Sequence, residues 1–251
     1  MTVKPRISIM ALLGLLTSVL AVIIAGKAVL DYRGGELHFV TALENFESGA
    51  YIAIVAMLLS LAGLWLSRPS SNIRGLLPSL FGLILSFPLV VYIANFEYAA
   101  RVYPPINDIT TDMNDPPSFW EVPNPVVYPG AKVAELQRQG YPELKSLKLA
   151  IDPEQAFKLA SNLAHDMGWE IVSEDVDELQ IEAVATSFLF GFEDYVVIRL
   201  QSTNGDTRVD MRSLSRLGKI DRGANARRIG TYLRSLEQRA STEGVPKVSQ
   251  N

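Results

Sequence analysis

Three long uncharged runs, at residues 7–26, 48–67 and 75–96, dominate the first part of the chain. Each has about 20 residues, the length that a helix needs to cross the hydrocarbon core of a bilayer. Backbone groups in lipid must bond within their own segment, so the runs are predicted to be membrane-spanning helices. Lys4 and Arg6 precede the first run as in a signal peptide, but its long apolar core and the two later runs favour a retained span.

Small residues recur in each run at spacings of three and four, which places them on one face of each helix. The sets are Gly14, Ser18, Ala21 and Ala25, then Ala53, Ala56, Ser60 and Gly63, and finally Gly75, Ser79, Gly82 and Ser86. Small faces let helix backbones approach closely in lipid, although these residues are also simply common in spans. We interpret the pattern as a compact three-helix bundle over residues 1–96.

The spans carry no Asp, Glu, Lys, Arg or His within their uncharged runs. Ion and proton pathways usually need such groups at membrane depth, so a transporter or pump acting alone is not expected. The connection at residues 27–47 has two basic and four acidic residues. Within it, Leu37, Val40, Leu43 and Phe46 recur at helical spacing and predict a short helix at the membrane surface.

Basic residues in the short connections predict the orientation. Lys4 and Arg6 precede the first span, and Arg68 and Arg74 flank the connection between the second and third spans. The positive-inside bias places these ends in the cytoplasm, together with the amino terminus. With three spans, the chain after residue 97 is then expected outside the cytoplasm.

A proline-rich stretch opens the soluble part, with seven of the 14 prolines between residues 104 and 129. Such a stretch has few free N–H donors and is predicted to form neither a helix nor a central strand. Its apolar residues Ile109, Phe119 and Trp120 favour an extended arm, at residues 97–131, that packs on the next domain rather than a plain spacer. The expected contact residues of this arm are Asn107, Asp108, Thr110, Thr111 and Asp112.

Residues 132–240 are predicted to form a small α+β domain. Asp152 and Pro153 mark the start of a helix that stops at Gly168, and a second helix covers residues 225–240. Strands are expected at residues 147–151, 169–173, 180–188, 195–202 and 207–216, with the hairpin signal Asn204-Gly205 between the last two. This order favours an antiparallel sheet with two helices on one face, and a loose polar tail at residues 241–251.

Side chains alternate along the last strand, so Arg208, Asp210 and Arg212 share one face of the sheet. Glu182 and Arg199 are expected on the same face, which is therefore predicted to be charged. Residues 1–96 carry a net charge of +2 and the remaining residues a net charge of −6. Nucleic-acid binding is disfavoured by the negative charge of the soluble part and by its expected place outside the cytoplasm.

Cysteine is absent, and the only histidines are His38 and His165. Disulfides, thiolate metal sites and cysteine nucleophiles are therefore excluded, and histidine-based catalysis or metal binding is disfavoured. His165 falls on the outer side of its predicted helix. The acidic cluster at residues 107–115 does not match the spacing of a calcium loop. The sequence thus predicts no catalytic residue, no metal and no cofactor.

Several motifs follow one another through the soluble part. They are Asn107-Asp108-Ile109-Thr110-Thr111-Asp112, Pro116-Pro117, Tyr141-Pro142-Glu143-Leu144, Arg212-Ser213-Leu214-Ser215-Arg216-Leu217-Gly218, and then Asp221, Gly223, Asn225 and Arg228. In this order they resemble the domain of unknown function family numbered 1499, over roughly residues 101–236. The resemblance implies a bacterial or plastid domain that often follows membrane spans. It implies no activity and no catalytic residue.

The strongest candidate site combines arginine, serine and asparagine side chains from the last strand and the turn after it: Arg212, Ser213, Ser215, Arg216, Arg222, Asn225 and Arg228. Arginine forks and a helix N-terminus suit carboxylate or phosphate, so one interpretation is an anion site for a lipid headgroup, a phosphorylated metabolite or an acidic peptide. The other interpretation is that these arginines pair with Asp108, Asp112 or Asp210 and hold the arm on the sheet.

The sequence as a whole predicts a multi-pass protein of a bacterial inner membrane, with its amino terminus in the cytoplasm and an α+β domain in the periplasm. A non-catalytic binding or assembly module, with the bilayer and another membrane or envelope protein as partners, is favoured. The alternative is an enzyme or lipid-binding factor that holds an anionic small molecule or headgroup with Arg212, Arg216 and Arg228.

Overall fold

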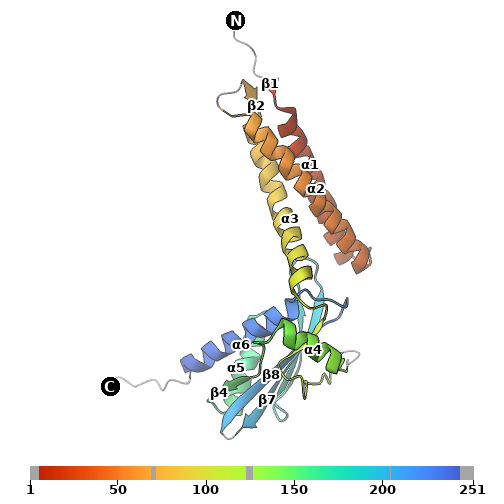
Figure 1. Ribbon diagram of the computed structural model, residues 1–251. Helices are drawn as coiled ribbons and strands as arrows, with labels where there is room; N and C mark the ends of the chain where they lie inside the picture. The colour runs from red at the N-terminus through yellow and green to blue at the C-terminus, as the bar shows by residue number, and fades with distance from the viewer. Residues whose placement is uncertain (1–5, 69–71, 123–126, 204, 244–251) are drawn as a thin grey trace, which may run out of the picture. The chain divides into compact units, whose positions relative to one another are not determined.

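The structure is a computed structural model that describes residues 6–68, 72–122, 127–203 and 205–243. The chain divides into two compact units, with the boundary between Tyr98 and Ala99. The first unit is helical and the second is built on a β-sheet (Figure 1).

Three helices make up the first unit: α1 (Ile9–Arg33), α2 (Phe39–Leu66) and α3 (Leu76–Val102), of which the last continues past the unit boundary. All three are long and apolar enough to cross a membrane, as predicted. His38 caps the start of α2, whose helix then continues without a break. The separate surface helix predicted around Leu43 is therefore wrong, because no proline or glycine interrupts residues 39–48 and the helix runs straight into the span.

The small residues of the three spans lie between the helices. All twelve that were predicted to face partner helices are buried. A Cβ atom on Gly14 of α1 would lie 2.5 Å from Ser60 Oγ of α2, and one on Gly63 would lie 2.6 Å from Ala11 Cα. Large apolar side chains such as Leu16, Leu58 and Ile84 are exposed instead. The unit therefore packs through small side chains and presents its large apolar ones at its outer surface, an arrangement that suits a bundle in lipid.

A short parallel pairing joins two distant parts of the first unit. Strand β1 (Arg6–Ile7) pairs with β2 (Ile73–Arg74), so that Arg6 lies opposite Ile73. The segment before α1 and the connection between α2 and α3 consequently lie at the same end of the bundle.

The second unit holds a six-stranded antiparallel sheet with the order β3-β8-β7-β6-β5, and β4 also pairs with β8. Its strands are β3 (Asp108–Thr110), β4 (Leu147–Leu149), β5 (Glu170–Asp175), β6 (Gln180–Thr186), β7 (Glu193–Thr203) and β8 (Asp206–Ser215). The predicted hairpin between β7 and β8 is confirmed, because Thr203 pairs with Asp206 and Gly205 has a φ of 92°. Asn204 of that signal lies outside the described residues.

Two helices cover one face of this sheet, α5 (Pro153–Asp166) and α6 (Ala224–Glu243) (Figure 1). The Asp152 carboxylate accepts the Glu154 N–H at 2.9 Å and starts α5 as predicted. The apolar core between helices and sheet includes Ile181, Val196, Ile198, Leu200, Val209, Met211, Leu163, Ile229, Tyr232 and Leu236. The predicted α+β class is confirmed. Helix α6 runs to Glu243, beyond the predicted start of the tail, and residues 244–251 lie outside the described part.

The proline-rich segment is less uniform than predicted. It contains β3, an edge strand, because residues 106–115 include no proline and keep their N–H donors. A helix that the sequence analysis missed, α4 (Ala131–Gly140), begins at its end. Val133 and Leu136 of α4 pack against the main core. Their spacing of three residues is the pattern in the sequence from which this helix could have been predicted. Residues 123–126 lie outside the described part.

Candidate functional site

The seven residues of the predicted arginine cluster occupy three separate places. Strand alternation separates Arg212, which faces away from the helices, from Ser213 beside it. Asn225 and Arg228 belong to α6, and Arg216 and Arg222 belong to the connection between β8 and α6. The structure therefore does not bring the seven side chains into one site.

The part of the cluster under α6 is a closed hydrogen-bond network. Ser213 Oγ donates to Asn225 Oδ1 at 2.8 Å, and Asn225 Nδ2 donates to Ser215 Oγ at 2.9 Å. Arg228 donates to Ser213 Oγ at 2.8 Å and to Asp194 Oδ2 at 2.5 Å. Ser213 and Asn225 are fully buried. The network therefore fastens α6 to β7 and β8 with the protein's own acceptors.

Arg212 lies on the opposite face and is 2% exposed. Its Nε and Nη2 donate to the two carboxylate oxygens of Asp108 at 2.8 and 2.7 Å, and Nη1 donates to Pro117 O at 3.2 Å. The guanidinium carbon lies 5.0 Å from the centre of the Phe119 ring and 5.5 Å from that of Tyr128. Burial raises the pKa of the Asp108 carboxyl, while Arg212 acts to lower it. Every edge of this arginine thus meets a residue of the proline-rich segment.

A second charged group surrounds Asp210, which is fully buried. Arg208 Nε lies 3.0 Å from Asp210 Oδ2, and Arg199 Nη2 lies 3.4 Å from the same oxygen. Arg208 also lies 2.6 Å from Asp112 Oδ2 of the proline-rich segment. Burial acts to raise the pKa of the Asp112 carboxyl, but the N–H groups of residues 115 and 114 and the Arg208 guanidinium outweigh it, so that pKa is lowered. These ion pairs give the segment a second attachment to β8.

Glu182 of β6 provides a third attachment that the sequence analysis missed. Glu182 is 2% exposed, and its carboxylate accepts the backbone N–H groups of Trp120, Glu121 and Val122 at 2.5, 3.1 and 3.1 Å. Gln180 Nε2 donates to the same carboxylate at 3.2 Å. Strand alternation predicted the face on which Glu182 lies. Its partners are backbone donors, which no residue pattern reveals.

The N-terminus of α6 was part of the predicted anion site, but a carboxylate of the protein itself occupies it. Asp221 accepts the N–H groups of Gly223 at 2.9 Å and of Asn225 at 2.7 Å. Burial raises the pKa of the Asp221 carboxyl, against the opposing effect of these two donors. Aspartate side chains commonly accept the N–H group two residues further along the chain, so this role could be predicted from the sequence.

Arg216 and Arg222 remain at the end of β8. Arg216 pairs with Glu193, and its side chain is 52% exposed. Arg222 is half-buried with a φ of 50°, and its carbonyl accepts a hydrogen bond from Arg227. Of the seven predicted residues, Arg216 is thus the one best placed to meet a partner in solvent.

The predicted arm contacts lie along β3 and its flanks. Asn107 Nδ2 donates to Gly218 O at 2.7 Å, and its carbonyl accepts the Ser215 N–H at 2.9 Å. The Thr110 backbone exchanges two hydrogen bonds with the buried Gln137 side chain of α4, at 3.1 and 2.5 Å. Thr111 Oγ1 donates to Asp210 at 3.2 Å. Gln137 was not predicted, because the backbone groups that its side chain meets lie 27 positions earlier in the chain.

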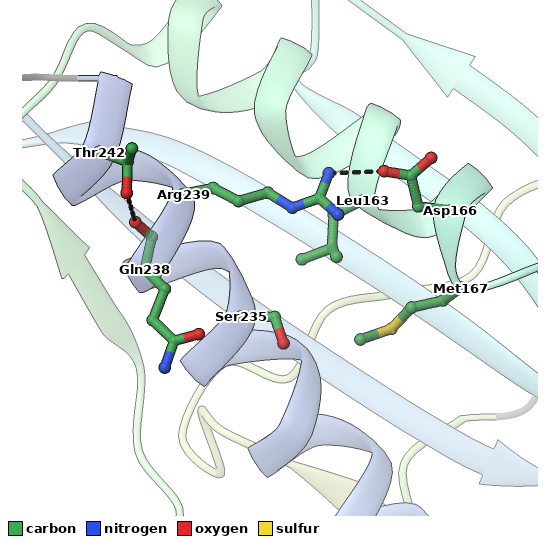
Figure 2. Close-up of a pocket in the computed structure, with 7 residues that line it drawn as sticks. All are labelled: Leu163, Asp166, Met167, Ser235, Gln238, Arg239 and Thr242. Carbon is green, nitrogen blue, oxygen red and sulfur yellow. Dashed lines mark hydrogen bonds and ion pairs between the residues drawn. The ribbon is translucent and has the colours of Figure 1, made fainter.

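A groove of about 520 Å³ separates α5 from α6. Figure 2 shows its seven lining residues: Leu163, Asp166, Met167, Ser235, Gln238, Arg239 and Thr242. Arg239 Nη1 lies 2.8 Å from Asp166 Oδ2, so the two charges in the groove already neutralise each other. Within the described ranges, no group of three or more His, Asp or Glu side chains is placed to hold a metal ion.

A family model described as protein of unknown function (DUF1499) matches residues 108–236, slightly more than half of the chain. No curated protein matches the chain. The matched range begins with β3 and ends within α6, so it includes the sheet, the helices that cover it and the contacts of Arg212 and Glu182.

Proposed function

The chain belongs to the family of proteins of unknown function DUF1499, and we propose that it is a membrane-anchored, non-catalytic module that binds or assembles with another membrane or envelope protein. Three helices that are long and apolar enough to cross a membrane precede the family domain. We place the domain at the outer face of a bacterial inner membrane.

The burial of Arg212 is the observation that carries this proposal. An arginine that recognises a carboxylate or phosphate ligand has to reach it with a free edge of its guanidinium group. Arg212 is buried, and the Asp108 carboxylate and the Pro117 carbonyl take up its donors. We therefore assign Arg212 to holding the proline-rich segment on the sheet, which leaves the outer surface of the domain for contacts with a partner.

The orientation rests on the pairing of β1 with β2. This pairing brings Arg6, Arg68 and Arg74 to the same end of the bundle. The connection at the other end contains Glu36, and Lys27 near it is paired with Asp31 at 2.7 Å. Basic residues favour the cytoplasmic side, so the Arg6 end is proposed to be cytoplasmic and the end of α3 extracytoplasmic.

Labelling of single cysteines tests the orientation, since the natural chain has none. Glu36→Cys and Asn72→Cys place exposed thiols in the two connections. In intact spheroplasts, a membrane-impermeant maleimide is expected to label the Glu36→Cys variant and to reach the Asn72→Cys variant only after permeabilisation. The reverse pattern would place the domain in the cytoplasm.

Native mass spectrometry of the protein, extracted gently from its own membrane, tests the assembly role. The proposal predicts a protein partner in fixed stoichiometry. A retained anionic compound without a protein partner would instead support the alternative, an enzyme or lipid-binding factor that holds an anionic group. Arg212 and Arg228 are paired inside the domain, so Arg216 is the arginine of that alternative that lies at the surface. In that case Arg216→Ala should release the compound, whereas Arg234→Ala, which removes an exposed arginine from α6, should not.

A further inference from the structure

Two connections of the second unit meet at one end of the sheet. The first joins β6 to β7 at residues 187–192, and the second joins β8 to α6 at residues 216–223. They are neighbours because the Arg216 N–H donates to Glu193 O at 3.3 Å. The residues that they carry are therefore presented on a common surface.

Exposed apolar side chains characterise this end. Residues 187–192 read Ser-Phe-Leu-Phe-Gly-Phe and contain no charge, and Phe188 is 94% exposed. In the second connection, Leu217 is 39% and Ile220 47% exposed. Phe190 stacks on Phe192 with ring centres 5.0 Å apart, which stiffens the base of the first connection. Apolar groups gathered in this way mark a surface that meets something other than water.

The charge of the sheet differs from one end to the other. At the Phe188 end, the exposed basic residues Arg216 and Lys219 interleave with the apolar ones. The acidic side chains at this end already have partners within the domain: Glu193 pairs with Arg216, Asp194 pairs with Arg228, and Asp221 accepts N–H groups at the start of α6. At the opposite end, the turn between β5 and β6 carries Asp175, Asp177 and Glu178. Apolar and basic side chains in alternation suit the interface of an anionic bilayer, which repels an acidic turn.

The length of the connecting chain limits how far this end can lie from the apolar run of α3. The uncharged run of α3 ends at Phe96, the helix continues to Val102, and the Asp221 N–H donates to Ile106 O at 3.1 Å. Helical residues advance about 1.5 Å and extended residues at most about 3.5 Å each, so the second connection lies within roughly 25 Å of chain from the end of the span. The acidic turn between β5 and β6 lies at the other end of the strands, so it is further from the end of the span by the length of those strands.

We propose that this end of the domain docks on the lipid surface, with Phe188, Leu217 and Ile220 entering the interfacial layer and Arg216 and Lys219 facing anionic headgroups. The bilayer is the occupant because the domain is tethered to it at this same end, and because this end carries the exposed Lys219 whereas the turn at the opposite end is acidic. This contact fixes how the domain stands on the membrane, and it is independent of the proposed protein partner.

Spin labelling of the full chain in nanodiscs that contain phosphatidylglycerol tests the docking. A label on the Phe188→Cys variant reports on the apolar end, and a label on Val176→Cys is the matched control, since Val176 is an apolar residue that is 60% exposed in the acidic turn. Oxygen concentrates in lipid and a nickel chelate in water. The ratio of oxygen to nickel accessibility is expected to be several-fold higher for Phe188→Cys than for Val176→Cys.

Equal ratios at the two positions would overturn the docking, because both labels would then lie in water. A label at position 188 that is shielded from both reagents, in nanodiscs and in detergent alike, would overturn it in favour of a protein contact. As a second variant, Lys219→Glu in the Phe188→Cys background is expected to lower the ratio. If the ratio of oxygen to nickel accessibility is unchanged in this variant, the proposed contact of the basic residues with anionic headgroups is wrong.

Discussion

The two faces of the β-sheet are closed in different ways. Helices α5 and α6 cover one face mainly with apolar side chains around Ile198 and Met211, and the network of Ser213, Asn225 and Arg228 adds one polar contact under α6. The proline-rich segment covers the other, where Arg212, Glu182 and Asp210 are buried among hydrogen bonds and ion pairs. A smaller apolar cluster lies beside them on this face and consists of Phe119, Val122, Tyr195, Val197 and Leu214. The same strands supply both faces, since side chains alternate along them. A regular helix can be held by its apolar stripe, whereas an irregular segment with many prolines needs a specific partner for its backbone groups.

This difference predicts how each face responds to change. Apolar burial is non-directional, so the loss of one methyl group from that face lowers the free energy of unfolding by only a small amount. A buried charge network depends on all of its members, since removal of one partner leaves the other charged and without solvent. The following variants separate the two behaviours. For each variant, the free energy of unfolding of the domain is measured by urea unfolding of the protein in nanodiscs, followed by tryptophan fluorescence.

The largest effect is expected for Arg212→Ala. The substitution leaves the Asp108 carboxylate buried without its partner and removes the cation from the Phe119 ring. Loss of one member of a buried ion pair costs about 3–5 kcal/mol of the free energy of unfolding. A loss below about 1 kcal/mol, the range of surface ion pairs, would show that the contact with Asp108 is not formed.

The double variant Arg212→Met, Asp108→Leu is the control for this effect. It removes both charges and fills the space with apolar side chains, so it is expected to regain most of the stability that Arg212→Ala loses. Proteolysis of residues 111–122 should follow the same order, with rapid cleavage in Arg212→Ala alone. Equal losses in the single and double variants would assign the stability to the arginine's contacts with Pro117 and Tyr128.

The next effect is expected for Glu182→Gln. The amide nitrogen cannot accept a hydrogen bond, so at least one of the three backbone N–H groups between Trp120 and Val122 loses its partner. A buried donor left without an acceptor costs about 1–3 kcal/mol. Glu193→Gln is the matched control, because Glu193 is half-exposed and its partner Arg216 lies at the surface. Similar losses for both variants would contradict the assignment.

A smaller effect is expected for Ile198→Val on the helix face. Ile198 is fully buried between the sheet and the helices, and the substitution removes one methyl group. The expected loss is about 0.5–1.5 kcal/mol of the free energy of unfolding, with the proline-rich segment still protected from protease. Protease sensitivity at residues 111–122 would show that the two faces are coupled and would break the comparison.

The smallest effect is expected for Arg216→Ala. Arg216 pairs with Glu193 at the surface, where solvent screens the interaction. The change in the free energy of unfolding should lie within about 0–1 kcal/mol. Arg216 directly follows the strand that carries Arg212, and both belong to the predicted cluster. A comparison of the two variants therefore shows whether burial or membership of the cluster decides the loss in the free energy of unfolding.

The helix-covered face could be predicted from the sequence in some detail. Apolar residues alternate along β8, Asp152 and Pro153 announce α5, and Gly205 marks the turn before β8. The small faces of the membrane helices were predictable for the same reason. In each case one residue type recurs at the period of its own secondary structure, and the pattern is local.

The other face could be predicted only in part. Alternation placed Arg212 and Glu182 on it, and Asp108 was among the expected partners of the arginines. The donors to Glu182 are backbone N–H groups some 60 residues away, and Gln137 meets β3 from a helix that the sequence analysis missed. Such pairs depend on which distant segments the fold brings together, and a periodic pattern within one segment cannot predict them.

Hydrogen exchange at residues 120–122 tests the account most directly. In the wild type, the N–H groups of Trp120, Glu121 and Val122 are expected to be strongly protected, although they belong to no helix or strand. Glu182→Gln should release this protection while the amides of β7 stay protected. Exchange of these three amides in the wild type at the rate of an unstructured chain would contradict the claim that the segment closes the polar face of the sheet.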